Sequence, residues 1–361
     1  MILALFEDPG YETLWPLTAT VPLYLLKVGP YRLYELWGRA LGVDEYALFC
    51  RRELEGFIDW LLNRVEGRGV EVNPEQLDDD VVAVNAAYLP LPDAAKVVRE
   101  LMSVAGNVIV HRSGRPLAIR ATRTTASSLA EAMRGVLESE LLLSMMEAFE
   151  DIPVAGRGEV SSIEGLCSHL EELLAVALES LGRGGVVVEE GARVEEHVVL
   201  REPAYVGRGV VVEPYSVIEG SSVEGPSRVG GYLSYTLVSA YSTVYVSRLE
   251  RTVLVGANVI GPYSSSIGGE ARALGFAARL MPSSALMGSS AVGVAALVSG
   301  LFKGRLGDGD AYESGKIRRI TREEAIGALR HQLSQFGRLP SDYELSFIER
   351  VLRRDREHAE R

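Results

Sequence analysis

A six-residue hydrophobic repeat occupies the middle of the chain. From residue 188 to 218 an aliphatic residue recurs at every sixth position, and a small or β-branched residue follows each one four positions later. The aliphatic series is Val188, Val194, Leu200, Val206, Val212 and Ile218. Neither a helix nor an alternating strand has this period. A parallel β-helix does, because three short strands form one coil and successive coils stack on each other.

The repeat continues towards the C-terminus with one interruption. It slips by one residue at Val223 and Val229 and is disturbed until about residue 253. It then returns at Leu274, Leu280, Leu286, Val292 and Val298. The alternative, a β-sandwich, would show a period of two with turn signals about every 8–12 residues, which this segment lacks. The pattern therefore predicts a parallel β-helix over residues 185–303.

A different pattern precedes the repeat. Strands are predicted at 1–6 and 81–89, helices at 31–41, 51–64 and from Pro92 to Ser103, and a hairpin around Ser113–Gly114. Alternating strands and helices favour an open α/β sheet covered by helices, which we assign to residues 1–155. Helical spacing predicts two further helices, near 126–150 and near 161–182, and the second belongs to a helical linker over 156–184. Residues 304–361 should form a charged helical tail that caps the solenoid, since stacked repeats need a polar cap.

Composition narrows the functional classes. The net charge of −12 argues against non-specific nucleic-acid binding, and no run of 18 apolar residues predicts a membrane span. The N-terminus lacks a basic leader, and Cys50 and Cys167 do not have a metal-binding spacing, so a cytoplasmic protein is expected. Only four of the 37 basic residues are lysines, and Asn and Gln are scarce. This composition fits a thermophile, although a GC-rich genome would also favour arginine.

An α/β domain followed by a six-residue repeat resembles the sugar-1-phosphate nucleotidyltransferases. The nearest resemblance is to the bifunctional N-acetylglucosamine-1-phosphate uridylyltransferase/glucosamine-1-phosphate acetyltransferase family. The residues that carry it are Leu14-Trp15-Pro16-Leu17-Thr18, Pro22, Leu25-Leu26, Val28 and Gly29. They are similar to the family signature G-x-G-T-R-L-x-P-L-T, P-K-x-L-L and V-x-G. The resemblance implies a Rossmann-like nucleotidyltransferase-type domain and a left-handed parallel β-helix.

The resemblance also implies a reaction and a set of site residues. A nucleoside triphosphate and a sugar 1-phosphate would be the substrates, with Mg²⁺ as cofactor and UDP-N-acetylglucosamine as one candidate product. Lys27 would neutralise phosphate, and Asn85 would bind the sugar or the base. The remaining nucleotide- or sugar-binding candidates are Thr13, Leu14, Thr18 and Arg32, and the Mg²⁺ candidates are Asp8 and Asp93. A homotrimer through the β-helix is also implied.

The chain departs from the family at the residues that handle phosphate. The loop Glu7-Asp8-Pro9-Gly10-Tyr11-Glu12 has one glycine and three acids, where the family has a Gly-rich loop whose N–H groups approach phosphates. Thr13 occupies the position of the family Arg, Leu23 that of its Lys and Ala87 that of its metal-binding Asp. Phosphoryl transfer relies on such charges. A catalytically degenerate homologue that binds sugar nucleotides, or that has a regulatory or assembly role, is therefore the alternative.

The β-helix raises the possibility of a second activity. Related acyltransferases use a histidine of the β-helix as general base, with acetyl-CoA as co-substrate. Here His197 lies in the first coils, and the later region has Tyr232 and Tyr235 instead of a histidine. These two tyrosines are the acyl-transfer candidates, although an unperturbed tyrosine is a poor base near neutral pH.

Overall fold

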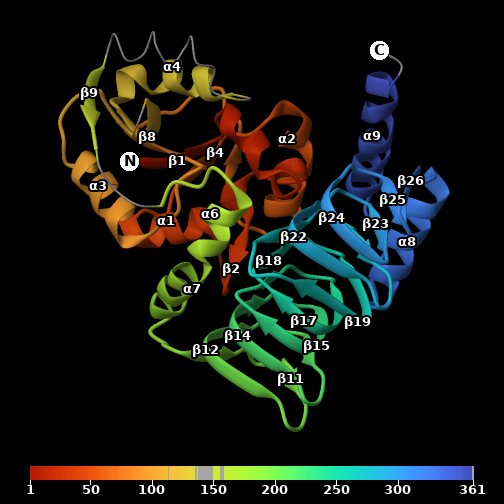
Figure 1. Ribbon diagram of the computed structural model, residues 1–361. Helices are drawn as coiled ribbons and strands as arrows, with labels where there is room; N and C mark the ends of the chain where they lie inside the picture. Colours follow the sequence, from red (N-terminus) through yellow and green to blue (C-terminus); the bar gives the residue numbers. More distant parts are fainter. Residues whose placement is uncertain (113, 135, 137–148, 155–157, 360–361) are drawn as a thin grey trace. The chain divides into compact units, whose positions relative to one another are not determined.

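The computed structural model describes residues 1–112, 114–134, 136, 149–154 and 158–359 (Figure 1). The chain forms two compact units. The first comprises Met1–Thr13, Val21–Leu26 and Tyr31–Ser161, and the second comprises Leu14–Thr20, Lys27–Pro30 and Ser162–Arg361. Two short segments of the N-terminal region thus belong to the second unit, whereas the sequence suggests a single domain over 1–155.

The first unit is built on a seven-stranded mixed sheet in the order β5-β4-β1-β6-β8-β7-β9. Its strands are β1 (Ile2–Phe6), β4 (Tyr46–Leu48), β5 (Glu71–Val72), β6 (Val81–Asn85), β7 (Val108–Arg112), β8 (Arg115–Ala121) and β9 (Glu150–Pro153). Strands β5, β4, β1 and β6 are parallel, and β8 runs antiparallel to β6. The predicted α/β sheet is confirmed.

Helices cover both faces of this sheet. They are α1 (Leu33–Leu41), α2 (Arg52–Asp59, continued by a π-turn over Trp60–Val65), α3 (Pro92–Met102) and α4 (Arg123–Met133). Three short 3₁₀ turns, Pro9–Leu14, Leu17–Ala19 and Leu23–Leu25, follow β1, and the two-residue strands β2 (Lys27–Val28) and β3 (Tyr31–Arg32) come next. Alternate residues of β1 pack with Leu129 and Met133 of α4. The helix expected near 126–150 lies largely outside the described residues.

The second unit is a parallel β-solenoid, as the six-residue repeat predicts. Strands β10 to β26 follow one another along it, and the longer strands, such as β12, continue from one coil into the next (Figure 1). They are β10 (Val186–Val188), β11 (Arg193–Val194), β12 (Val199–Val206), β13 (Val210–Val212), β14 (Val217–Val223), β15 (Ser227–Ser234), β16 (Leu237–Val238), β17 (Thr243–Glu250), β18 (Thr252–Leu254), β19 (Val259–Ile267), β20 (Arg272–Leu274), β21 (Arg279–Leu280), β22 (Ala285–Val292), β23 (Leu297–Ser299), β24 (Leu301–Leu306), β25 (Asp310–Glu313) and β26 (Lys316–Arg319). The parallel pairing of the strands up to β25 excludes a sandwich, and β26 pairs antiparallel with β25. Paired strands therefore continue beyond residue 303.

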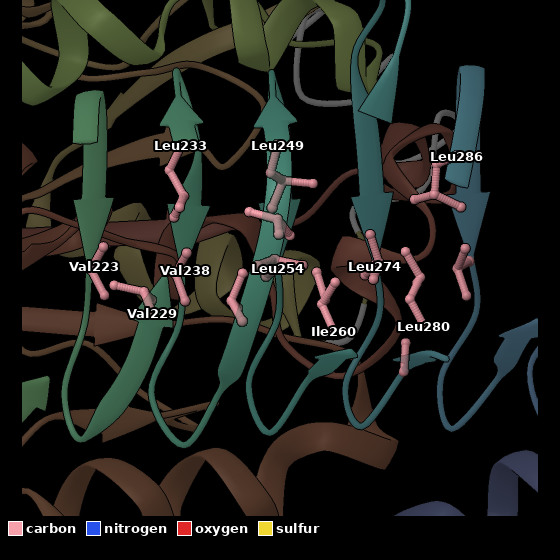
Figure 2. Packing of buried hydrophobic residues seen from close by; sticks show 14 of the residues in the cluster. Val223, Val229, Leu233, Val238, Leu249, Leu254, Ile260, Leu274, Leu280 and Leu286 are labelled. Atoms are coloured by element: carbon pink, nitrogen blue, oxygen red, sulfur yellow. The ribbon is translucent and has the colours of Figure 1, made fainter. Parts of the chain in front are cut away.

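The aliphatic residues of the repeat form the core of the solenoid. Val223, Val238, Leu254 and Leu274 occupy equivalent positions in successive coils, and Figure 2 shows them as one row inside the stack. All four side chains are buried. The sequence therefore places the core correctly once the period is recognised, because one aliphatic residue per strand points inward.

Helices lie alongside the solenoid within the second unit. They are α6 (Ile163–Ser168), α7 (Leu170–Glu179), α8 (Arg322–Ser334) and α9 (Asp342–Ala359). The Gln332 amide of α8 donates to the Tyr241 carbonyl (2.7 Å) and the Thr243 hydroxyl (3.0 Å) of the fourth coil. The tail therefore covers a lateral face of the stack, and not only the end that the sequence suggests. Among the described residues no helix is long and apolar enough to cross a membrane.

Candidate functional site

Polar side chains gather where the parallel strands of the first unit end. Glu7 and Asp8 follow β1, Arg51 comes three residues after β4, and Asn85 is the last residue of β6. The carboxyl ends of adjacent parallel strands meet at one edge of a sheet, and open α/β sheets bind ligands at this edge. We call these residues, together with Arg115, the carboxyl-edge cluster.

Asp8 is the centre of the carboxyl-edge cluster. Its carboxylate accepts hydrogen bonds from Arg115 Nε (2.5 Å) and Nη2 (2.6 Å), from Asn85 Nδ2 (2.7 Å) and from the Gly10 N–H (2.9 Å). Burial alone would raise the pKa of Asp8, but the hydrogen bonds from Arg115 and Asn85 outweigh it and hold the pKa below its usual value. Asp8 is therefore a stable carboxylate with a bidentate arginine partner.

Arg115 connects Asp8 to a second acid. Its Nη1 lies 3.2 Å from Glu159 Oε1, so the guanidinium bridges two carboxylates. Tyr88, whose backbone forms an isolated bridge with Glu159, has a buried hydroxyl for which the described residues offer no hydrogen-bond partner. Burial raises the pKa of this tyrosine, so the hydroxyl stays protonated.

Glu7 and Arg51 form a second, more deeply buried ion pair. One carboxylate oxygen of Glu7 accepts from the Arg51 backbone N–H (3.2 Å) and from Arg51 Nε (3.2 Å). The other oxygen is buried and has no hydrogen-bond partner within the described part of the chain. Burial raises the pKa of Glu7 despite its arginine neighbour. The Arg51 guanidinium also lies 4.1 Å from the centre of the Tyr11 ring, a cation–π distance.

The structure brings only some of the predicted site residues together. Asp8 and Asn85 are in direct contact, and the Thr13 hydroxyl donates to the Gly10 carbonyl in the loop after β1. Arg32 pairs with Glu66 and also donates to the Leu25 carbonyl (2.6 Å). Asp93 is exposed in the first turn of α3. The roles proposed for these residues remain predictions.

Three predicted nucleotide-site residues belong to the solenoid unit. Leu14 and Thr18 lie in the segment Leu14–Thr20, and both are buried. Lys27 Nζ is 3.1 Å from Glu224 Oε1, and the neighbouring Gly29 N–H donates to the Ser222 hydroxyl (2.9 Å). The ammonium group thus neutralises a solenoid carboxylate in this structure.

Sequence reasoning missed both arginines of the carboxyl-edge cluster. Arg115 directly precedes residues 116–121, the second strand of the predicted hairpin, and in the structure it opens β8, which is antiparallel to β6. The first residue of β8 must then lie at the carboxyl edge of β6. Arg51 follows β4, which is only three residues long and carries no clear alternation. Without that strand, nothing in the sequence places Arg51 near the loop after β1.

The solenoid candidates lie on its outer surface. The Tyr232 hydroxyl donates to Glu219 Oε2 (2.6 Å), and this bond, with some burial, raises the pKa of Tyr232. The charge of Glu171 is the main cause of the raised pKa of Tyr235. A raised pKa makes a tyrosine a weaker general base near neutral pH. Both tyrosines remain candidates only as hydrogen-bond donors.

Mg²⁺ would have to be held by few protein ligands. No group of three or more His, Cys, Asp or Glu side chains suited to a metal occurs among the described residues. Protein-bound Mg²⁺ commonly uses one or two carboxylates and completes its shell with water and substrate phosphates. Asp8 is ionised and lies at the ligand-binding edge, so it fits this arrangement once Arg115 releases one of its oxygens.

Comparison with known proteins identifies a family that resembles the first unit. Residues 3–153 match the sugar nucleotidyl transferase family. The resemblance seen in the sequence is thereby confirmed for this region, which contains all of the carboxyl-edge cluster. No curated protein matches the chain.

Two solved structures are similar to parts of the chain at low TM-scores. One is described as a candidate glucose-1-phosphate thymidylyltransferase from Bacillus anthracis in complex with sucrose. It has 14% identity and a TM-score of 0.33, and the match covers 49% of this chain and 94% of that one. The other is a hexapeptide transferase family protein from Anaplasma phagocytophilum, with 15% identity, a TM-score of 0.24, and coverage of 42% and 88%. At these TM-scores neither match adds to the functional argument.

Proposed function

We propose that the protein is a sugar-1-phosphate nucleotidyltransferase with its active site at the carboxyl edge of the first unit. The observation that carries this proposal is the contact of Asp8 with Arg115 and Asn85. This contact lies at the ligand-binding edge of the sheet, within the region that matches the sugar nucleotidyl transferases. The substrates would be a nucleoside triphosphate and a sugar 1-phosphate.

The proposed reaction forms one phosphoanhydride bond and breaks another. An oxygen of the sugar phosphate attacks the α-phosphorus of the triphosphate, and the bond from that phosphorus to the bridging oxygen of the β-phosphate breaks, releasing pyrophosphate. Bound Mg²⁺ would reduce the charge repulsion between the phosphates. Asp8 would hold the ion, and Arg115 would bind a phosphate oxygen in place of the Asp8 carboxylate.

The two arginines of the cluster supply the positive charge that the acidic loop lacks. Arg115 offers a planar fork of N–H donors that matches phosphate geometry. The paired acids Asp8 and Glu159 keep Arg115 oriented towards the edge before substrate arrives. Asn85 has its amide nitrogen on Asp8 and its carbonyl on the Ala87 N–H, so it fixes the position of the Asp8 carboxylate.

The rival function is binding of a sugar nucleotide without catalysis. The acids Glu7, Asp8 and Glu12 in the loop after β1 favour it, since they oppose close approach of phosphate. Pyrophosphate release and ligand binding separate the two functions. A protein that binds a sugar nucleotide at this edge, yet releases no pyrophosphate from any nucleotide and sugar 1-phosphate pair, belongs to the rival class.

The direct test is a pyrophosphate-release assay with a panel of nucleoside triphosphates and sugar 1-phosphates in Mg²⁺. UTP with N-acetylglucosamine 1-phosphate is the first pair to try, because the sequence resemblance favours it. Loss of one donor to transition-state charge typically lowers kcat about 10²–10³-fold, and we expect a loss of this order for Arg115→Ala.

Arg120→Ala is the matched control. Arg120 is on the same strand, β8, and its Nη2 pairs with Asp80 Oδ2 (2.7 Å) near the opposite edge of the sheet. Its removal should leave turnover within about twofold, since it lies away from the proposed active site. Equal losses in both variants would show that fold stability, and not the carboxyl-edge cluster, controls the activity.

Acyl transfer and trimer formation are separate parts of the proposal. If the solenoid transfers an acetyl group from acetyl-CoA, Tyr232 and Tyr235 are its candidate residues, and Tyr232→Phe should slow release of free CoA. A homotrimer would use a lateral face of the solenoid as its interface. Light scattering with size-exclusion chromatography would measure the mass of the assembly in solution.

A further inference from the structure

The two ends of the solenoid differ in how their core residues are covered. The first coil consists of β10, β11 and the first half of β12. Its core-position side chains Val188 and Val194 are 41% and 37% exposed. At the other end, Leu306 and Ala311 are fully buried. The start of the stack therefore exposes apolar surface that equivalent positions elsewhere bury.

The first coil also directs backbone N–H and C=O groups away from the second coil, towards the end of the stack. Glu189 N–H donates to Val206 O, Glu195 N–H to Val212 O and Val199 N–H to Ser216 O, all at 2.9–3.0 Å in the second coil. Backbone groups of successive strand residues point to opposite sides. Those of Val188, Val194 and Leu200 are therefore directed away from the stack. An exposed strand edge of this kind is a template for pairing with another chain.

The outer surface of β11 carries charges that complement a second copy of itself. Arg193 and Glu195 flank Val194, and their side chains pair with each other at 2.6 Å. If Val194 pairs antiparallel with Val194 of a second copy, Arg193 lies opposite the second copy's Glu195, and Glu195 lies opposite its Arg193. The strand is thus self-complementary in charge.

The six-residue repeat extends this match to the other two strands. A two-fold axis through Val194 sets Val188 opposite the second copy's Leu200, because both are six residues from Val194. The same axis sets Glu189 opposite Val199 and Glu196 opposite Ala192. No acid of the first coil then faces an acid, although four glutamates lie between residues 189 and 196.

We propose that the first coil is the interface of a two-fold symmetric, end-to-end dimer of this chain. Three antiparallel strand pairs would form, β11 with itself and β10 with the first half of β12, and they would cover the exposed valines. This interface is independent of the catalytic proposal. If a lateral face also forms trimers, the product is a dimer of trimers.

Light scattering coupled to size-exclusion chromatography of the full chain tests this interface. Val194→Asp places a carboxylate in the centre of the apolar contact, and we expect it to halve the mass of the wild-type assembly. Arg193→Glu places like charges opposite each other, and we expect the dissociation constant to rise about tenfold or more. The R193E/E195R double variant restores opposite charges across the axis and should regain the wild-type mass.

Arg248→Glu is the control for the charge change. Arg248 and Glu250 form the same i, i+2 pair in the fourth coil at 2.9 Å, away from the end of the stack. This variant should keep the wild-type mass. Wild-type protein with the same mass as V194D would overturn the proposal, and so would an R193E defect that the double variant does not repair. The first coil would then be bare or covered by another molecule.

Discussion

Glu7 and Asp8 are neighbours in the sequence, yet their environments shift their pKa values in opposite directions. Asp8 accepts several hydrogen bonds, and its pKa is lowered even though burial opposes this. Among the described residues Glu7 has a hydrogen-bond partner on one oxygen only, and burial raises its pKa. The lowered pKa of Asp8 contributes stability above its unfolded-state pKa, and this contribution is lost as pH falls through the folded-state pKa.

Glu7 has the opposite effect on the pH dependence of stability. Because its folded-state pKa is raised above 4.5, the folded protein loses stability as pH rises from that value through the raised pKa. Glu7→Gln removes the buried charge and keeps an acceptor for Arg51. We expect the melting temperature of this variant, relative to wild type, to be higher at pH 8 than at pH 4.5.

Glu131→Gln is the control for this measurement, because Glu131 is exposed on α4 of the same unit. Its melting temperature should follow that of wild type at both pH values. If the difference between Glu7→Gln and wild type is the same at pH 4.5 and pH 8, Glu7 is not the buried charge that this account describes.

At the scale of elements, the solenoid explains why its own repeat is interrupted in the sequence. Val186 pairs with Ala204, 18 residues later, as three hexapeptides require. Arg228 pairs with Thr243, only 15 residues later, and Thr252 pairs with Arg272, 20 residues later. Coils that shorten through β-bulges or lengthen through an insertion keep their core in register but lose the sequence period. A fixed period therefore cannot locate their strands.

Long elements could be predicted from the sequence, whereas very short ones could not. The helices predicted near 31–41, 51–64 and 92–103 are confirmed, and the predicted helical tail is present as α8 and α9. The strands β4 and β5 have three residues and two residues, too few to show an alternation. The place of Arg51 depends on β4 and could not be predicted, and Asp8 and Asn85 are the members of the carboxyl-edge cluster that were predicted as site residues.

The inserted turn of the longest coil depends on one buried arginine. The Arg272 side chain is fully buried and donates to the carbonyls of Ile267 (2.6 Å), Gly268 (3.0 Å), Glu270 (2.7 Å) and Glu250 (3.3 Å). Arg272→Met would leave these carbonyls without that donor. We expect a loss of about 3 kcal/mol in the free energy of unfolding, measured with urea.

Arg248→Met is a suitable comparison for that variant, because the Arg248 side chain is 57% exposed on another coil. It should cost less than about 1 kcal/mol, as surface substitutions usually do. A similar small loss for Arg272→Met would mean that the inserted turn is held by its backbone alone.

At the scale of the whole molecule, part of the sequence motif belongs to a different unit from the proposed active site. The residues that carry the family resemblance from Leu14 to Thr18, and also Lys27, are part of the solenoid unit. The carboxyl-edge cluster is entirely in the α/β unit. The motif therefore pointed to Lys27 and Arg32 as phosphate-binding cations, because these two residues lie near it in the sequence. The fold supplies Arg51 and Arg115 from segments that the motif does not include.

The most direct test of the catalytic account is a crystal structure with Mn²⁺, a non-hydrolysable nucleoside triphosphate and a sugar 1-phosphate. We expect an anomalous Mn²⁺ peak at about 2–2.2 Å from an Asp8 carboxylate oxygen, with Arg115 moved from that oxygen onto a phosphate. Nucleotide bound elsewhere on the protein, with the Asp8–Arg115 pair intact and no metal beside it, would contradict the account.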